Sequence, residues 1–247
     1  MTGLRSKRWE RERLSLAVRG LTKIYDGTVA VDRLDFDVAH GEIVAVVGPN
    51  GAGKSTTFLC LAGLVRSDAG TITFDGAPLG AERGRTIALI PETPEVYPML
   101  TVAEHLTFVA ALTKQPPGWK SRADSLLERL GIADERDTLG HALSKGMRQK
   151  TLIAATVLGG APVLLLDEPL IGLDPLGQRE LRAIVADLRS DGHAILVSTH
   201  LLESAAAMCD RMIVLDRGRL VASGTIDELR GRGSGSLESI FLDVTGR

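Results

Sequence analysis

The chain has 247 residues and a formal net charge of −2; 44% of the residues are hydrophobic and 24% are charged. These proportions are ordinary for a globular chain that buries one large α/β core. A chain this close to neutrality has no overall positive field, so we expect no nucleic-acid partner. No stretch approaches the ~18 consecutive apolar residues that a spanning helix needs, which argues against an integral membrane protein.

The first part of the chain is polar at residues 1–13, which include five basic residues. We expect a disordered basic tail there rather than a secretory signal, because the stretch has no apolar centre. Residues 14–18 and 29–38 then alternate between apolar and polar side chains, which predicts two antiparallel strands. Tyr25 lies between them and could stack on a purine, although its spacing alone favours an ordinary turn tyrosine.

A glycine-rich segment at residues 48–55 fits the phosphate-binding pattern G-x-x-x-x-G-K-[ST]. A β-branched apolar run at 42–47 precedes it, as in a buried strand, and residues 56–63 are typical of a helix that ends at a glycine. Such a loop aims backbone N–H groups and the positive end of a helix dipole at phosphate. Lys54 is expected to reach the β- and γ-phosphates, and the Ser55 hydroxyl to bind Mg²⁺. The predicted phosphate-binding residues are Gly48, Pro49, Asn50, Gly51, Ala52, Gly53, Lys54, Ser55 and Thr56.

Residues 99–158 show no strand pattern and are predicted to be helical. Thr101 and Glu104 form a capping box at the start of the first helix. After a Pro-Pro-Gly break, a second helix is expected from residue 121. Leu106, Val109 and Leu112 are expected on one face of the first helix.

The segments on either side of this helical stretch read as an α/β core, at residues 14–98 and 159–230. Asp174 and Pro175 pair an N-cap residue with a proline at the first helical position. Residues 231–247 are predicted to be a flexible linker and a short terminal segment. Further core strands are predicted at 70–76, 86–91, 162–166, 193–198, 212–215 and 219–222, and a helix at 201–209.

Two acids, Asp167 and Glu168, end the buried strand at 162–166. Strand ends of a parallel sheet meet at one edge, and the phosphate loop opens at the same edge. Asp167 is placed to hold Mg²⁺ or its water, and Glu168 to polarise an attacking water. His200 ends the neighbouring strand at this edge. A pair of solvated acids and a structural histidine are the alternatives, but the buried strand and the shared edge favour a site.

A second phosphate site is suggested by residues 143–150. Ser144 is a good N-cap, yet Gly146 in the first turn costs about 1 kcal/mol relative to alanine. We interpret this bare helix start as an anion site. Because the chain already has its own phosphate loop, Ser144 and Gly146 are expected to bind the nucleotide of another copy.

Together these motifs resemble the ATP-binding subunit of an ABC transporter, in order and spacing, from about residue 14 to 229. Residues 48–55 resemble Walker A, 163–168 resemble Walker B, and 143–147 resemble the signature usually written LSGGQ. Residues 173–174 resemble the end of the D-loop. The resemblance further implies that His200 is the switch histidine and that Tyr25 stacks on adenine, which reverses the spacing-only interpretation of Tyr25. The terminal segment is similar to that of ATPases from ABC-2-type exporters.

Three departures from the family pattern affect the site. Glu92 replaces the Q-loop glutamine; we expect it to keep a metal contact but to add negative charge beside the γ-phosphate. In the signature, Lys145 replaces the first glycine and Met147 the final glutamine. Ile171 stands where the D-loop commonly has serine.

The resemblance implies an α/β P-loop NTPase core with a mostly parallel sheet, an antiparallel β subdomain and an inserted helical subdomain at 99–158. It implies an ATPase that uses ATP and Mg²⁺, with Lys54, Glu168 and His200 as catalytic residues and Ser55, Glu92 and Asp167 at the metal. The implied partners are a separate transmembrane permease and a second ATPase subunit, identical or paired. We expect a peripheral protein on the cytoplasmic face of the membrane, and we expect the transporter that it powers to be an exporter. The alternatives are a soluble ABC-type switch and a regulatory subunit not coupled to transport.

Overall fold

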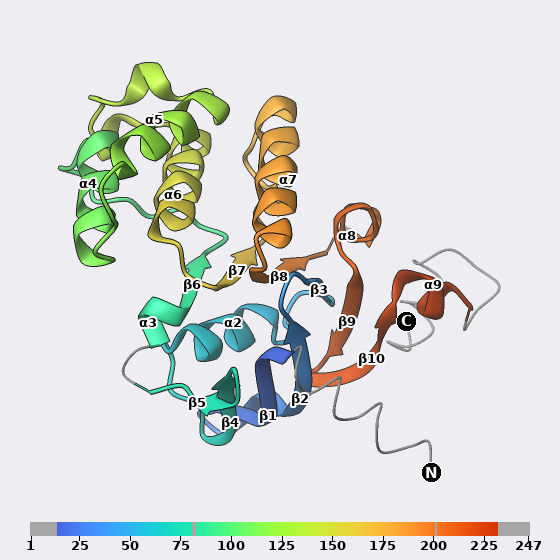
Figure 1. Ribbon diagram of the computed structural model, residues 1–247. Coiled ribbons are helices and arrows are strands. Elements are labelled where there is room, and N and C mark those ends of the chain that lie inside the picture. Colours follow the sequence, from blue (N-terminus) through green and yellow to red (C-terminus); the bar gives the residue numbers. More distant parts are fainter. Residues whose placement is uncertain (1–13, 81–82, 201, 232–247) are drawn as a thin grey trace, which may run out of the picture.

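The computed structural model describes residues 14–80, 83–200 and 202–231, arranged as two β-sheets with helices packed on them (Figure 1). The segments predicted as a basic tail, 1–13, and as most of the linker and terminal piece, 232–247, lie outside the described residues. Residue 231 belongs to the last described helix, so the predicted linker begins one residue too early.

The larger sheet has six strands in the order β10-β9-β3-β8-β7-β6. Its strands from β9 to β6 run parallel, and β10 pairs antiparallel with β9. This is the mostly parallel sheet that the sequence predicts, and it brings the carboxyl ends of β3, β7 and β8 to one edge. The bounds are β3 (Ile43–Val47), β6 (Ile87–Ile90), β7 (Val163–Asp167), β8 (Ala194–Thr199), β9 (Arg211–Asp216) and β10 (Arg219–Thr225).

The smaller sheet is antiparallel, with four strands in the order β2-β1-β4-β5. The two long strands pair across the Asp26-Gly27 turn, as the alternating pattern predicts, and Tyr25 is the last residue of β1 opposite Thr28. The bounds are β1 (Leu14–Tyr25), β2 (Thr28–Ala39), β4 (Ala69–Phe74) and β5 (Ala77–Pro78).

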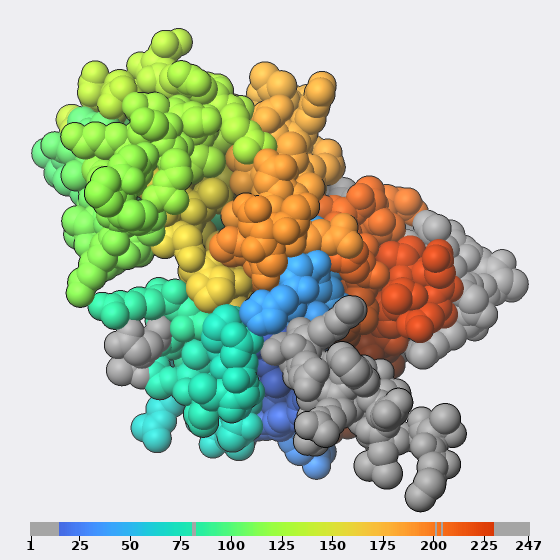
Figure 2. Space-filling model, in the orientation of Figure 1, coloured from blue at the N-terminus to red at the C-terminus, as the bar shows by residue number. Residues whose placement is uncertain are grey.

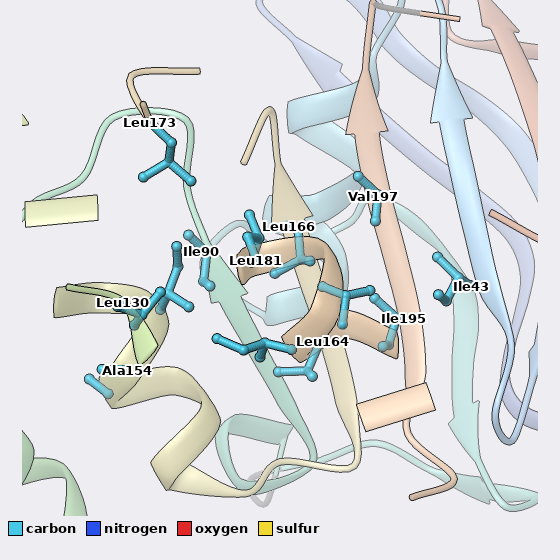
Figure 3. Close-up of a cluster of buried hydrophobic side chains, with 14 of the residues drawn as sticks. Ile43, Ile90, Leu130, Ala154, Leu164, Leu166, Leu173, Leu181, Ile195 and Val197 are labelled. Atoms are coloured by element: carbon cyan, nitrogen blue, oxygen red, sulfur yellow. The ribbon is translucent and has the colours of Figure 1, made fainter. Parts of the chain in front are cut away.

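The parallel strands are buried on both faces, and successive side chains enter two different cores. In β3, Val44 and Val46 pack with the small sheet and helix α2 (Lys54–Ala62), while Ala45 and Val47 face the opposite core. Figure 3 shows part of that opposite core, where Leu164 and Leu166 of β7 meet Leu181 and the β8 residues Ile195 and Val197. This two-sided burial explains why these strands read as continuous apolar runs.

Helices α6, α7 and α8 lie on the second face of the large sheet, and α4 and α5 pack on α6 beyond it, whereas α3 lies beside α2 (Figure 1). In the space-filling view, residues of α4 to α6 form a lobe beside α7, above the β-rich part (Figure 2). The bounds are α3 (Arg83–Thr86), α4 (Val102–Leu112), α5 (Trp119–Arg129), α6 (Lys145–Gly159), α7 (Pro175–Ser190), α8 (Leu202–Met208) and α9 (Ile226–Gly231), with 3-10 turns at Ala133–Glu135 and Gly140–Ala142. Among these described helices, none has the length and apolar character needed to cross a membrane.

The capping box of α4 is present, but two details of the predicted helices are wrong. Leu112 is 65% exposed, whereas Leu106 is buried. Two steps of three residues rotate a side chain by 600°, so Leu112 lies about 120° away from Leu106 around the helix. Helix α5 begins at Trp119, two residues before the predicted start, because Gly118 adopts a left-handed conformation as its N-cap.

Candidate functional site

The glycine-rich segment joins β3 to α2, as predicted, and its glycines are needed for two different reasons. Gly53, the N-cap residue of α2, has φ of 102°, which other residues rarely adopt. At Gly48 the constraint is close packing, since an added Cβ would lie 2.4 Å from the Leu215 carbonyl oxygen. The loop is thereby held against the end of β9.

Lys54 lies at the start of α2 and is only 8% exposed. Its amino group donates to the carbonyl oxygens of Gly48 and Pro49, at 2.8 and 3.2 Å, so the side chain folds back over the loop. Burial lowers the pKa of Lys54, and the nearby carboxylates of Glu168 and Asp167 partly oppose that shift. The charge is therefore poorly solvated and positioned to meet an anion.

The two acids at the end of β7 are both buried. Ser198 of β8 pairs directly opposite Asp167, and its hydroxyl donates to an Asp167 carboxylate oxygen. The same hydroxyl accepts a hydrogen bond from the Glu168 backbone N–H at 3.2 Å. Through the strand register, Ser198 thus holds the Asp167 carboxylate and the Glu168 backbone.

Glu168 contacts the predicted histidine. Its carboxylate lies 2.8 Å from Nδ1 of His200, which is about half exposed. Glu168 has φ of 47°, a left-handed conformation that is costly for a non-glycine residue. The strained backbone and the buried, hydrogen-bonded carboxylate are typical of a functional position rather than a solvated strand end.

These residues surround one cavity of about 750 Å³, a size suited to a nucleotide. Of the predicted site residues, the structure brings the following to its wall: Asn50, Gly51, Ala52, Gly53, Lys54, Ser55, Thr56, Glu92, Asp167, Glu168 and His200. Ile171 also lines it, at the D-loop position that departs from the family pattern.

Five predicted binding residues do not line this cavity, and two of them, Gly48 and Pro49, belong to the phosphate loop itself. Tyr25 is 42% exposed, at the end of β1, and the Lys23 amino group lies 5.0 Å from the centre of its ring. Ser144 is the exposed N-cap of α6, where its hydroxyl accepts the Met147 N–H at 3.3 Å. Gly146 follows in the first turn of that helix. Within a single chain, Tyr25, Ser144 and Gly146 are therefore not part of the cavity wall.

Gly146 has a packing explanation that the sequence interpretation lacked. A Cβ at this position would lie 2.8 Å from the Gly172 carbonyl oxygen, so the start of α6 lies directly against the segment that follows β7. The same contact region includes Lys150, whose amino group is 3.1 Å from the Asp174 carboxylate. That hydrogen bond lowers the pKa of Asp174. Asp174 is the N-cap residue of α7 with Pro175 at the first helical position, as predicted, although its side chain makes the ion pair with Lys150 and no capping hydrogen bond.

Sequence reasoning misses three supports of the site. It identifies Ser198 only as part of a strand end. Gly218, in the turn between β9 and β10, donates its N–H to the Ala52 carbonyl at 3.0 Å. The Ala30 carbonyl would be 2.6 Å from a Cβ at Gly53, so β2 also braces the loop. In the sequence, Gly218 indicates only a turn and gives no sign that its N–H bonds to Ala52.

Ser55, Glu92 and Asp167 offer hydroxyl and carboxylate oxygens to the same cavity, which are the donors that Mg²⁺ prefers. Within the described ranges, no three His, Cys, Asp or Glu side chains are grouped to hold a metal by themselves. Protein-bound Mg²⁺ usually takes one or two carboxylates and completes its shell with water and substrate phosphates. The donor set therefore fits Mg²⁺ that is bound together with a triphosphate.

A phosphate loop between a parallel strand and a helix, with two buried acids and a histidine at the same sheet edge, defines a P-loop nucleoside triphosphatase. The family model described as ABC transporter matches residues 31–171. The chain belongs to this ABC transporter family, as an ATP-binding subunit that hydrolyses ATP to power a transporter.

Individual relatives agree with this assignment. The Haemophilus influenzae lipopolysaccharide export system ATP-binding protein LptB is 35% identical over 221 residues, 87% of this chain and 92% of that protein. The Streptomyces peucetius daunorubicin/doxorubicin resistance ATP-binding protein DrrA is 38% identical over 240 residues, 94% of this chain and 72% of that protein. A solved ATP binding subunit of an ABC transporter superposes with a TM-score of 0.89 at 35% identity, covering 94% of this chain and 99% of that one. The fold is thus that of ABC ATPases, and a transporter subunit is favoured over the soluble alternatives.

Proposed function

We propose that two copies of the chain, or this chain and a paired subunit, close head to tail around two ATP molecules. The observation that carries this proposal is the separation of the two phosphate-binding motifs. Lys54, Asp167, Glu168 and His200 share one cavity, whereas Ser144 at the start of α6 does not line it. A second copy would bring its own Ser144 and Gly146 to this cavity.

Within each closed site, the residues take distinct roles. Lys54 and the loop N–H groups bind the β- and γ-phosphates, and Ser144 and Gly146 of the second copy bind the γ-phosphate from the other side. Glu168 is the general base that takes a proton from the attacking water, and His200, hydrogen-bonded to it, contacts the γ-phosphate. The ring of Tyr25 stacks on adenine.

Ser55, Asp167 and Glu92 are the residues that would hold Mg²⁺, which supplies charge neutralisation at the phosphates when bound. Glu92 places a carboxylate where the family usually has an amide. We propose that it keeps the metal contact and the coupling role at the cost of slower hydrolysis. Equal turnover of Glu92→Gln and the wild type, with the same Mg²⁺ dependence, would count against this role.

The partner is a separate transmembrane permease, with this chain attached at the cytoplasmic face of the membrane. A cavity of about 850 Å³ beside the nucleotide site would receive a cytoplasmic helix of that permease. It is lined by residues 93–98 together with Gly140, His141 and Arg148. Relatives named for lipopolysaccharide export and for drug resistance support the direction of transport as export.

We propose that the chain is one ATPase domain with an inserted helical part. Residues 14–230 form the ATPase domain, in which 14–98 and 159–230 carry the nucleotide and the helical part, 99–158, carries the signature turn. Helices α4 and α5 lie inside that helical part, and α6 ends at Gly159, one residue past it, which supports the division to within one residue.

The test is the oligomeric state of Glu168→Gln with ATP and Mg²⁺, measured by light scattering on a sizing column. A lost general base should slow hydrolysis by ~10²- to 10⁴-fold without weakening ATP binding, so the closed dimer should accumulate. A second substitution, Ser144→Arg, should return this variant to a monomer that still binds ATP. A Glu168→Gln chain that binds ATP but stays monomeric, even with a reconstituted permease, would reject head-to-tail closure.

A further inference from the structure

The segment between β6 and α4, residues 91–101, runs past both cavities described above. Glu92 lines the nucleotide cavity, and residues 93–98 line the neighbouring cavity of about 850 Å³. The segment is therefore the shortest covalent path between the two. The contacts that hold this segment determine whether it moves with the helical part or with the sheet.

His105, in the first turns of α4, holds the middle of this segment. The ring is 5% exposed. Its Nε2 lies 2.8 Å from the backbone nitrogen of Tyr97, and its Nδ1 lies 2.7 Å from the backbone oxygen of Thr101. The ring also stacks with that of Tyr97, at 5.9 Å between centroids.

These two partners fix the protonation of the ring. A backbone N–H can only donate, so Nε2 of His105 must accept from Tyr97. A backbone carbonyl can only accept, so Nδ1 must carry the proton that it donates to Thr101. The geometry therefore requires the neutral Nδ1–H tautomer, and neither nitrogen is left free for another role.

Further contacts tie the same segment to the helical side of the molecule. The Gly140 N–H donates to the Leu100 carbonyl at 2.8 Å, and the His141 N–H donates to the Pro98 carbonyl at 3.0 Å. Gly140 also packs so closely that a Cβ there would be 2.4 Å from the Tyr97 carbonyl oxygen. Residues 97–100 are thus attached both to α4 and to the turn that precedes α6.

We propose that His105 is a positioning residue that makes this segment move as one body with α4. A displacement of the helical part would then shift Glu92, five residues before Tyr97, relative to the phosphate loop. This inference rests on the proposed role of Glu92 at the nucleotide, and it assigns to a buried histidine the attachment that transmits the movement.

Two substitutions separate the two ring nitrogens. In His105→Asn the amide lies close to Cβ, as Nδ1 does, so it can still donate to Thr101 but cannot reach Tyr97. In His105→Gln the longer side chain reaches the position of Nε2 and can accept from Tyr97. Both replacements are neutral, polar amides, so they form a matched pair.

The experiment is hydrogen exchange of the full chain in the Glu168→Gln background, with and without ATP and Mg²⁺. We expect the Tyr97 amide to be protected in the parent and in the Gln variant, and ATP to change the exchange of residues 93–100 in parallel with α4. In the Asn variant, loss of one hydrogen bond should speed Tyr97 exchange by about five- to tenfold and remove the response to ATP. Equal exchange in the Asn and Gln variants would overturn the proposal.

Turnover gives a second readout in chains that keep Glu168. We expect kcat to fall in His105→Asn with an unchanged KM for ATP, and to recover in His105→Gln. Should the Asn variant unfold, ¹⁵N shifts of His105 in the wild type still decide the matter, because a proton on Nε2 excludes the bond from Tyr97. ATP affinity, measured separately, distinguishes failure of this attachment from failure of the nucleotide site itself.

Discussion

Lys54 is a buried cation held against the carbonyls of its own loop, and this environment makes nucleotide binding depend on pH. Burial lowers its pKa, while a bound triphosphate would raise it again by direct attraction. Binding should therefore take up a proton once the pH exceeds the pKa of the free chain. The apparent affinity for ATP should then fall with rising pH, by at most about tenfold per unit.

The measurement is calorimetric titration with ATP from pH 7 to 10, in buffers with different ionisation enthalpies. Lys54→Arg is the control, because a guanidinium keeps its proton over this whole range. Its affinity should vary less with pH than that of the wild type. Identical pH slopes for the two proteins would show that Lys54 is not the group that takes up the proton.

Ser198 is the residue that holds both the Asp167 carboxylate and the Glu168 backbone. Replacing it with alanine leaves a buried Asp167 oxygen without its donor, which should cost about 1–3 kcal/mol of the free energy of unfolding. Because such supporting bonds orient metal ligands, the Mg²⁺ requirement for hydrolysis should rise by about 10- to 100-fold. Thermal melts and Mg²⁺ titrations of turnover check both effects.

Ser190→Ala is the matched control for that substitution. Ser190 is exposed near the end of α7, and its hydroxyl donates to the Ala186 carbonyl of its own helix. It should leave both stability and Mg²⁺ dependence nearly unchanged. A Ser198→Ala protein that matches Ser190→Ala in both measurements would contradict the supporting role of Ser198.

The sequence predicts those residues whose pattern lies within a few consecutive positions, and it misses those that act through contacts between distant segments. Asp167 and Glu168 end an apolar run beside a phosphate-loop pattern, and both signals lie within a few consecutive residues. Ser198 acts through a hydrogen bond across two strands, and that bond depends on the Asp167–Ser198 register, which no local pattern encodes. The strained φ of Glu168 is equally invisible before the backbone is known.

At the scale of elements, the start of α6 shows how close packing can override helix propensity. Alanine is the better helix former by about 1 kcal/mol, so propensity alone predicts that Gly146→Ala stabilises the protein. Its Cβ would meet the Gly172 carbonyl oxygen at 2.8 Å, and backbone must shift to accept it. We expect a net loss of about 1–3 kcal/mol in the free energy of unfolding.

Gly159, at the other end of the same helix, is the internal comparison. A Cβ there would lie 3.5 Å from the Val109 side chain, an ordinary contact. Gly159→Ala should therefore be neutral or stabilising by about 0.5 kcal/mol. Chemical denaturation of both variants measures the difference, and a Gly146→Ala protein as stable as Gly159→Ala would refute the packing argument.

The helices and strands can be predicted where capping or turn residues flank a periodic pattern of apolar side chains. The capping box at Thr101, the Gly63 helix end and the Asp26-Gly27 turn each placed a boundary correctly. Sequence patterns are insufficient where tertiary packing decides. Spacing alone places Leu112 on one face with Leu106, although its side chain is exposed. The packing of Gly146 against Gly172 is also invisible to local sequence, because the two residues are distant in the chain.

At the scale of the whole molecule, the proposed function requires that each nucleotide site be made from two copies. The only indication in the sequence that two copies share a site is that one chain carries two phosphate-binding motifs. The fold adds a spatial reason, because Ser144 caps α6 in the helical part, whereas Lys54 begins α2, which follows β3 of the large sheet. Two defects placed in different motifs should therefore complement each other.

The corresponding experiment mixes two inactive variants, Lys54→Met and Ser144→Arg. In a mixed dimer, one site combines both defects, while the other pairs an intact Lys54 with an intact Ser144. If half of the dimers are mixed and each has one working site of two, activity should return to about a quarter of the wild-type level. Each variant alone should stay inactive, and ATP turnover of the mixture is followed over a range of mixing ratios.

Activity that peaks at equal amounts supports shared sites. If light scattering shows mixed dimers and the mixture still stays inactive, neither copy completes the site of the other.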